Sequence, residues 1–271
     1  MRKYLFILLF VFAAVEVSAA RIDTVAVFSA KMRRDIPALV VVPDGGVGRR
    51  MPVLYLLHGF GGSYTTWQNI TDLRPLADAC GMIVVCPDGA NSWYWDSPLD
   101  PASQFETFVA QELPDWIDAR YLTIPSREGR AVTGLSMGGH GALWVALRHK
   151  DRFGAAGSTS GGVDIRPFPD SWEMKRQLGE LKDNPERWDA HTVIRQAALL
   201  RDGELALSGV VESREYYGLY IKYYITVEGQ TLKVIEKNDG VNIYEPAQQV
   251  SVVINPAHVM AYEAGEEAAH A

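Results

Sequence analysis

Short apolar runs alternate with helical patterns along most of this chain. There are four such runs, and helical patterns separate the last three: Val53–Leu57, Met82–Cys86, Ala131–Thr133 and Ala155–Ser160. Continuous apolar runs of this length are typical of strands that are buried on both faces of a parallel sheet. The alternation therefore predicts an α/β fold, with a mostly parallel sheet and helices on both of its faces.

Two further strands and a long helix belong to the same prediction. Thr24–Phe28 and Leu39–Val42 indicate strands that are joined antiparallel. Apolar residues at helical spacing run from Phe105 to Ile117. We expect Pro114 to bend this helix, because proline lacks the amide hydrogen that a helix interior requires.

The pattern changes near residue 208. Beyond it, tyrosine-rich and β-branched runs replace the helical period: Tyr216–Val227, Thr231–Ile235 and Val250–Ile254. Short strands separated by turns favour a small all-β barrel. The predicted organisation is a leader over 1–19, an α/β domain over 20–207, a barrel over 208–263 and a flexible tail over 264–271.

The leader has the features of a cleavable signal peptide. Arg2 and Lys3 supply positive charge, Tyr4–Val15 is almost wholly apolar, and small residues come after it. A membrane anchor is the alternative, but a span requires about 20 apolar residues. We therefore expect cleavage after Ala19, a secreted or periplasmic mature protein, and no stable membrane span once the signal is removed.

Composition narrows the range of partners. The 271 residues are 48% hydrophobic and 22% charged, which is enough apolar sequence for a full core. Lys and Arg number 26 against 33 Asp and Glu, so the net charge is −7. A chain this acidic is poorly suited to a phosphate backbone, and we expect no nucleic-acid partner.

The two cysteines, Cys80 and Cys86, flank a predicted strand. A strand advances about 3.3 Å per residue, which would hold the two Cα atoms roughly 20 Å apart, whereas a disulfide needs less than ~7 Å. We therefore expect both to be free, buried thiols.

The strongest chemical motif is Gly134-Leu135-Ser136-Met137-Gly138. A G-x-S-x-G sequence between a strand and a helix forms a sharp turn that lifts the serine hydroxyl clear of the sheet. An apolar run precedes this motif and a helical stretch, His140–Trp144, comes directly after it. We therefore predict that Ser136 is a catalytic nucleophile; the alternative is a glycine-rich turn with a bystander serine.

A second glycine-rich motif, His58-Gly59-Phe60-Gly61-Gly62, directly follows an apolar run. Acyl transfer develops an oxyanion, which needs fixed backbone N–H donors. The predicted donors are the amides of Met137, next to the nucleophile, and of Phe60. The alternative for this loop is a plain turn from strand to helix.

Together these motifs resemble the esterase family of the α/β-hydrolases that includes tributyrin esterase, feruloyl esterases, S-formylglutathione hydrolase and the mycolyltransferases. The resemblance covers about 22–207, with matching segments at Leu56–Gly62, Cys86–Gly89, Ser92–Pro98, Glu112–Pro114, Gly134–Gly139 and Ser160–Gly162. It implies an α/β-hydrolase fold, a Ser-Asp-His triad, no metal or cofactor, and a small-molecule ester substrate with a short or aromatic acyl group. Trp93, Tyr94 and Trp95 would then lie beside the acyl pocket; alternatively, they only pack the loop.

The family pattern stops after Leu207. The family places its triad acid just after a strand that Glu204–Leu207 would begin, and its base further on, but neither is found. The triad acid and base are therefore unassigned.

The segment from Ser208 onward resembles the TOBE barrel that is appended to ATP-binding subunits of ABC importers. The matching segments are Gly209–Val211, Tyr217-Gly218, Tyr244–Val250 and Ile254–Val259, although no Walker motif is present. The join after Leu207 is either a natural fusion or the product of a frameshift, deletion or assembly error.

None of the six histidines is expected to complete a triad or to belong to a metal site. They are His58 in the oxyanion loop, His140 on the helix after the nucleophile, His149 at a solvated helix end, His191 in a family segment outside the triad, His258 after Asp239 in the barrel pattern, and His270 in the tail.

Two functions fit these observations. The first is a secreted carboxylic-ester hydrolase that works through an acyl-enzyme and is impaired because its triad acid and base are not found. The alternative is a non-catalytic binding or regulatory fusion that carries a transport-associated barrel. The sequence leaves the acyl and alcohol specificity and the oligomeric state open.

Overall fold

A computed structural model describes residues 20–44, 48–200, 206–227, 229–238, 240 and 243–253. They form two compact units, one ending at Trp188 and the other beginning at Asp189. The predicted leader and tail, together with Asp239, His258 and His270, lie outside the described residues. The predicted domain boundary after residue 207 stays a prediction.

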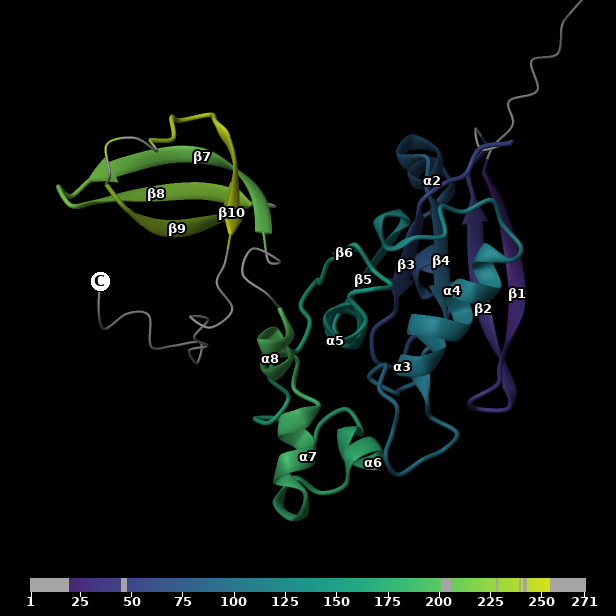
Figure 1. The fold of residues 1–271 in the computed structure, drawn as a ribbon. Coiled ribbons are helices and arrows are strands. Elements are labelled where there is room, and N and C mark those ends of the chain that lie inside the picture. The colour runs from purple at the N-terminus through teal and green to yellow at the C-terminus, as the bar shows by residue number, and fades with distance from the viewer. Residues whose placement is uncertain are drawn as a thin grey trace, which may run out of the picture. The chain divides into compact units, whose positions relative to one another are not determined.

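The first unit is built on a six-stranded mixed sheet (Figure 1). In spatial order its strands are β1 (Arg21–Ser29), β2 (Arg34–Val42), β4 (Ile83–Pro87), β3 (Val53–Leu57), β5 (Arg130–Gly134) and β6 (Ala155–Ala156). β2 is antiparallel to both of its neighbours, β1 and β4, whereas β4, β3, β5 and β6 are parallel to one another. The predicted α/β fold is confirmed.

Helices cover both faces of this sheet. On one face α1 (Thr66–Ile70) and α2 (Arg74–Cys80) pack against a core that includes Leu39, Val41, Val84 and Cys86. The alternate side chains of the same strands face the other way, because successive residues of a strand point to opposite faces. That second face is covered by α3 (Phe105–Thr107), α4 (Leu113–Asp118) and α5 (Met137–Arg148) (Figure 1).

The predicted long helix is divided before Pro114. A π-helical segment, Phe108–Glu112, joins α3 to α4 and leaves the proline in the first turn of α4. Pro114 cannot donate to the carbonyl oxygen of Ala110, four residues earlier. That oxygen instead accepts a hydrogen bond from Arg152 Nε at 3.1 Å, and Arg152 also pairs with Asp115. The segment after α5 is thereby fastened to α4.

Two expectations within this unit need correction. Cys80 and Cys86 are both free, as predicted, but Cys80 is exposed rather than buried. It is the last residue of α2, which buries Ala77 and ends at Gly81 in the left-handed conformation. Regular strand structure in β6 covers only the start of the predicted run 155–160, although Gly157 and Thr159 continue to hydrogen-bond with β5.

The remaining helices come after β6. They are α6 (Met174–Leu178), α7 (Pro185–Ala190) and α8 (Val193–Gln196). None of the helices in the described ranges has the length and apolar character that crossing a membrane requires.

The second unit contains a separate, curled antiparallel sheet (Figure 1). Its strands in spatial order are β10 (Gln249–Val253), β7 (Ala206–Tyr216), β8 (Tyr220–Val227) and β9 (Gln230–Lys237). A turn at Gly218, with φ of 73°, divides the run that the sequence predicted as one strand. Ala206 and Leu207 pair with β10, so they belong to this sheet and not to the sheet of the first unit.

Candidate active site

Ser136 stands on the tight turn between β5 and α5. Its φ is 55°, a sparsely populated positive-φ conformation that costs a non-glycine residue of order 1–3 kcal/mol. The turn leaves no room for side chains beside it: a Cβ added to Gly138 would lie 2.4 Å from the carbonyl oxygen of Leu57. The Ser136 amide donates to the carbonyl oxygen of Thr159 at 2.8 Å, and the residue itself is exposed.

The glycine-rich loop after β3 lies against this turn. A Cβ on Gly59 would be 3.6 Å from Ser136 Cβ. The amides of Gly61 and Gly62 are both engaged, with Asn91 Oδ1 and the Gly59 carbonyl oxygen. The Phe60 amide, directly before them in the motif, donates to no acceptor within the part of the chain that the structure describes.

The Met137 amide likewise has no hydrogen-bond acceptor among the described residues. As the first residue of α5 it has no acceptor within the helix. The described residues provide it with no other acceptor. Both predicted oxyanion donors are therefore available, and the strands β3 and β5, which pair in parallel, bring their loops to one edge of the sheet.

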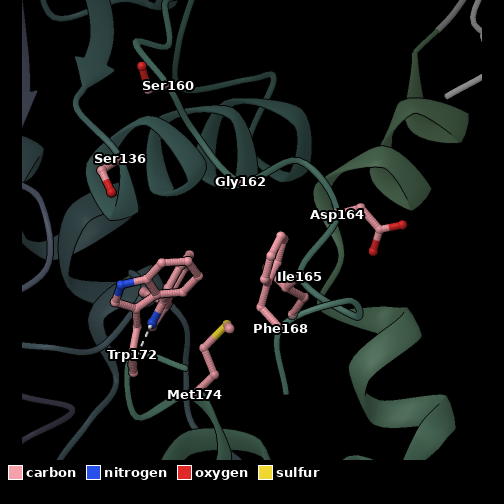
Figure 2. Close-up of a pocket in the computed structure, with 9 residues that line it drawn as sticks. Ser136, Ser160, Gly162, Asp164, Ile165, Phe168, Trp172 and Met174 are labelled. Carbon is pink, nitrogen blue, oxygen red and sulfur yellow. Dashed lines mark hydrogen bonds between the residues drawn. The ribbon is translucent and has the colours of Figure 1, made fainter. Parts of the chain in front are cut away.

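Ser136 opens on a cavity of about 200 Å³ (Figure 2). The other lining residues are Trp93, Ser160, Gly162, Asp164, Ile165, Phe168, Trp172 and Met174. Figure 2 shows the Asp164 carboxylate pointing away from Ser136, and it pairs with Arg166. Asp164 is therefore not placed to serve as the acid of a triad in this arrangement.

Most of this lining was missed by the sequence analysis. The predicted Trp93 lines the cavity, and so do Ser160 and Gly162 of the family segment 160–162, but the lining residues between 164 and 174 were not singled out. Their position after β6 is the signal that could have found them, because ligands of α/β sheets bind outside the carboxyl ends of the strands.

The three predicted aromatic residues are separated by the structure. Trp93 and Tyr94 both have φ of 59°, so consecutive side chains leave the loop in different directions. Tyr94 is fully buried and donates to the carbonyl oxygen of His58 at 3.1 Å. Trp95 is also fully buried and stacks behind Trp93 with ring centroids 5.6 Å apart. Only Trp93 of the three lines the Ser136 cavity.

His58 has a structural position in the loop. Its Nδ1 donates to the Gly59 carbonyl oxygen at 2.8 Å, and its Nε2 accepts from the Gly89 amide at 2.8 Å. This pairing requires the neutral ring with the proton on Nδ1. Burial lowers the pKa of His58, which favours the same neutral state.

His140 is engaged in a similar way. It is fully buried, its Nδ1 donates to the Gly162 carbonyl oxygen at 2.7 Å, and its Nε2 accepts from Trp95 Nε1 at 2.9 Å. With both nitrogens occupied, it holds the loop at Gly162 against the helix that begins after Ser136 and is not available as a base.

The third histidine of the first unit, His149, was expected to be solvated, and this is wrong. Its side chain is only 19% exposed, and Nε2 lies 2.9 Å from Glu106 Oε1. Glu106 also accepts from Arg148 and Trp144, each at 2.8 Å. This cluster could not be predicted from the residues around His149, because Glu106 lies more than 40 residues earlier.

The cluster also sets the ionisation of Glu106. Burial alone would raise the pKa of this carboxyl, but the hydrogen bonds from His149, Arg148 and Trp144 bring it below its usual value. Glu106 is thus held as a carboxylate at the far end of α5 from Ser136. Within the described ranges, no group of three or more His, Cys, Asp or Glu side chains is arranged to hold a metal ion.

An exposed serine on a strained strand-to-helix turn, at the edge of a mixed sheet covered by helices, defines an α/β-hydrolase fold. The family model described as "Putative esterase" matches residues 29–208, more than half of the chain, and the chain belongs to this family. A TOBE domain model matches residues 185–261.

Known relatives agree with this assignment. The MPT51 antigen of Mycobacterium leprae is 35% identical over 187 residues, which cover 59% of this chain and 60% of that protein. An esterase of Mycobacterium tuberculosis is 37% identical over 134 residues, or 47% of this chain and 29% of that protein. The chain thus spans from under a third to 60% of these curated relatives.

Solved structures give the same fold. The crystal structure of Mycobacterium tuberculosis MPT51 is 30% identical with a TM-score of 0.55, covering 67% of this chain and 70% of that one. A ferulic acid esterase is 27% identical with a TM-score of 0.54, covering 68% of this chain and 74% of that one.

Proposed function

We propose that the first unit is a serine ester hydrolase and that Ser136 is its nucleophile. The observation that carries this proposal is the exposed, strained Ser136 at the mouth of a cavity. The amides of Phe60 and Met137 beside it, which have no acceptor among the described residues, and membership of the esterase family support it further. The substrate is a small ester with a short or aromatic acyl group, as the apolar lining favours.

The reaction would take the acyl-enzyme route. The Ser136 oxygen attacks the ester carbonyl carbon, and the two amides donate to the oxyanion that forms. The alcohol leaves with a proton, and water then hydrolyses the acyl-serine. In this proposal the acyl group lies among the apolar side chains of the cavity lining, beside Trp93 and Trp172.

Turnover in this chain is proposed to be low. A general base must take the hydroxyl proton, and all three histidines of the first unit are engaged elsewhere. Loss of the base in such a triad costs on the order of 10⁴-fold to 10⁶-fold in turnover, while the oxyanion donors and binding retain about 10³-fold over water.

A second proposal concerns location and the C-terminal unit. The apolar stretch Tyr4–Val15 supports export and removal of the leader. The TOBE match over 185–261 favours a binding or regulatory role as the alternative to catalysis. N-terminal sequencing of the secreted chain tests export: a start near Ala20 supports it, and retention of Met1 contradicts it.

The hydrolase proposal is tested with a short activated ester, p-nitrophenyl butyrate. We expect a slow rate that Ser136→Ala abolishes and that Ser160→Ala, a matched change in the same cavity lining, largely retains. Equal rates for the chain and Ser136→Ala would favour the binding or regulatory role. A rate typical of working esterases that depends on Ser136 would contradict the proposed impairment.

A further inference from the structure

One wall of the cavity is formed by the segment around Trp172, and the backbone of this segment is hydrogen-bonded to the loop that carries Trp93. Trp93 Nε1 donates to the carbonyl oxygen of Trp172 at 3.2 Å, a dashed line in Figure 2. A second bond, from Ser97 Oγ to the carbonyl oxygen of Gln177 at 2.9 Å, joins the same two segments. The bonded residues are 79 and 80 positions apart in the sequence. The two segments are therefore held in a fixed alignment with each other.

Trp172 forms the outer part of this wall. Its side chain is 48% exposed, whereas Trp93 behind it is only 4% exposed. The Trp172 ring lies 5.6 Å from Phe168 and 6.2 Å from Trp93, centroid to centroid. Figure 2 shows Trp172 on the Ser136 side of the cavity, with Ile165 and Phe168 across from it. The exposed indole thus borders the cavity at its opening.

The backbone is strained at both tryptophans, Trp172 and Trp93. Trp172 has φ of 48° and Glu173 has φ of 56°, and Trp93 on the other segment has φ of 59°. Such conformations cost non-glycine residues about 1–3 kcal/mol each and persist only where the surroundings fix them, which is characteristic of ligand clamps. Here the two hydrogen bonds between the Trp93 and Trp172 segments fix the backbone.

We propose that the Trp172 indole is the specificity-determining group of the Ser136 cavity, limiting the length of the acyl group that fits. The inference rests on the proposed function for the acyl end of the ligand. A cavity of about 150 Å³ lined by apolar side chains accepts a benzene ring. The Ser136 cavity, at about 200 Å³, therefore fits an acyl group near the size of one aromatic ring.

The structure allows the indole to be removed without disturbing its support. Trp93 donates to the backbone carbonyl of Trp172, which Trp172→Ala retains. The side chain is half exposed, so its truncation leaves no enclosed core cavity. Trp172→Phe keeps an aromatic wall and serves as a graded variant. Trp116→Ala removes an indole of the same size that instead packs against Tyr121 and Arg120.

The experiment measures binding in a Ser136→Ala background, where esters cannot be cleaved through Ser136. Methyl butyrate, methyl benzoate and methyl dodecanoate share one alcohol and differ only in the acyl group. Their affinities are measured by ligand-observed NMR. We expect methyl benzoate to bind best and methyl dodecanoate to bind at least about tenfold more weakly, because a long chain must pass the indole.

Trp172→Ala should weaken methyl benzoate about tenfold, the scale of one lost aromatic contact, and reduce the discrimination against methyl dodecanoate to about threefold. Trp172→Phe should fall between, and Trp116→Ala should leave the profile unchanged. An unchanged profile in Trp172→Ala, an equal change in Trp116→Ala, or no binding of any ester would overturn the inference. Binding that matches the expected profile, without any Ser136-dependent hydrolysis in the unmodified chain, would instead refute only the proposed catalytic function.

Discussion

The two ends of α5 differ in how their polar groups are satisfied. At the start of the helix, Ser136 is exposed on a strained turn and the Met137 amide has no acceptor in the described part of the chain. At its end, His149 and neighbouring donors converge on the buried carboxylate of Glu106. Buried polar groups are normally satisfied, so the second end anchors the helix, whereas the open amide at the first end is what the proposed oxyanion site requires.

The comparison predicts that the two ends respond differently to substitution. The start of the helix depends on the close approach of backbones and should be sensitive to a single methyl group. The end depends on a charge and its partners and should be sensitive to the loss of that charge and to pH.

The largest effect is expected for Gly138→Ala. Alanine is favoured over glycine in helices by up to about 1 kcal/mol, yet here its Cβ would lie 2.4 Å from a backbone oxygen of β3. We expect the free energy of unfolding to fall by about 3 kcal/mol or more, measured by urea denaturation. In the control Gly162→Ala the nearest atom is 3.8 Å away, and the change should be small. Equal stability of the two variants would contradict the claim that the turn depends on the close approach of Gly138 to β3.

Glu106→Gln should have the next largest effect. It removes the charge that Arg148 and His149 share, and we expect a loss of about 2 kcal/mol in the free energy of unfolding. The control Glu173→Gln removes an exposed pair with Arg176 and should cost less than about 0.5 kcal/mol. Ser136-dependent activity per folded molecule should not change. A loss of that activity would mean that the two ends of α5 are coupled.

The pH dependence of stability should be a smaller effect of the same cluster. Because the folded pKa of Glu106 is below its usual value of 4.5, the unfolded chain binds more protons as the pH falls toward the folded pKa. The stabilisation is therefore present above pH 4.5 and is lost below it. Between about pH 6 and pH 4, the unmodified chain should lose more stability than Glu106→Gln, by less than about 1 kcal/mol. Parallel urea midpoints for the two proteins would contradict this assignment.

The sequence was sufficient for features that depend on neighbouring residues. The β3 run, the turn at Ser136 and the loop at Phe60 are predictable from apolar content and glycine spacing, and the structure places them at one edge of the sheet. The antiparallel pair β1–β2 was also predicted from local patterns, and its pairing is confirmed.

Features that depend on distant contacts were not predicted. The wall at Trp172 is positioned by a hydrogen bond that Trp93, 79 residues earlier, donates to the Trp172 carbonyl oxygen, and nothing in the local sequence indicates it. The burial of His149 by Glu106 has the same origin. Strand pairing of Ala206 and Leu207 with β10 could not be foreseen either, because a short apolar run does not determine which sheet it joins.

The most direct test of the central claim is to detect the acyl-enzyme itself. The chain is incubated with p-nitrophenyl acetate, with and without added imidazole, and acetylated peptides are identified by mass spectrometry. Imidazole supplies the base that the engaged histidines of the first unit do not. We predict acetylation on Ser136 that increases with imidazole. Acetylation that is confined to other residues, or that is unchanged by Ser136→Ala, would contradict the account.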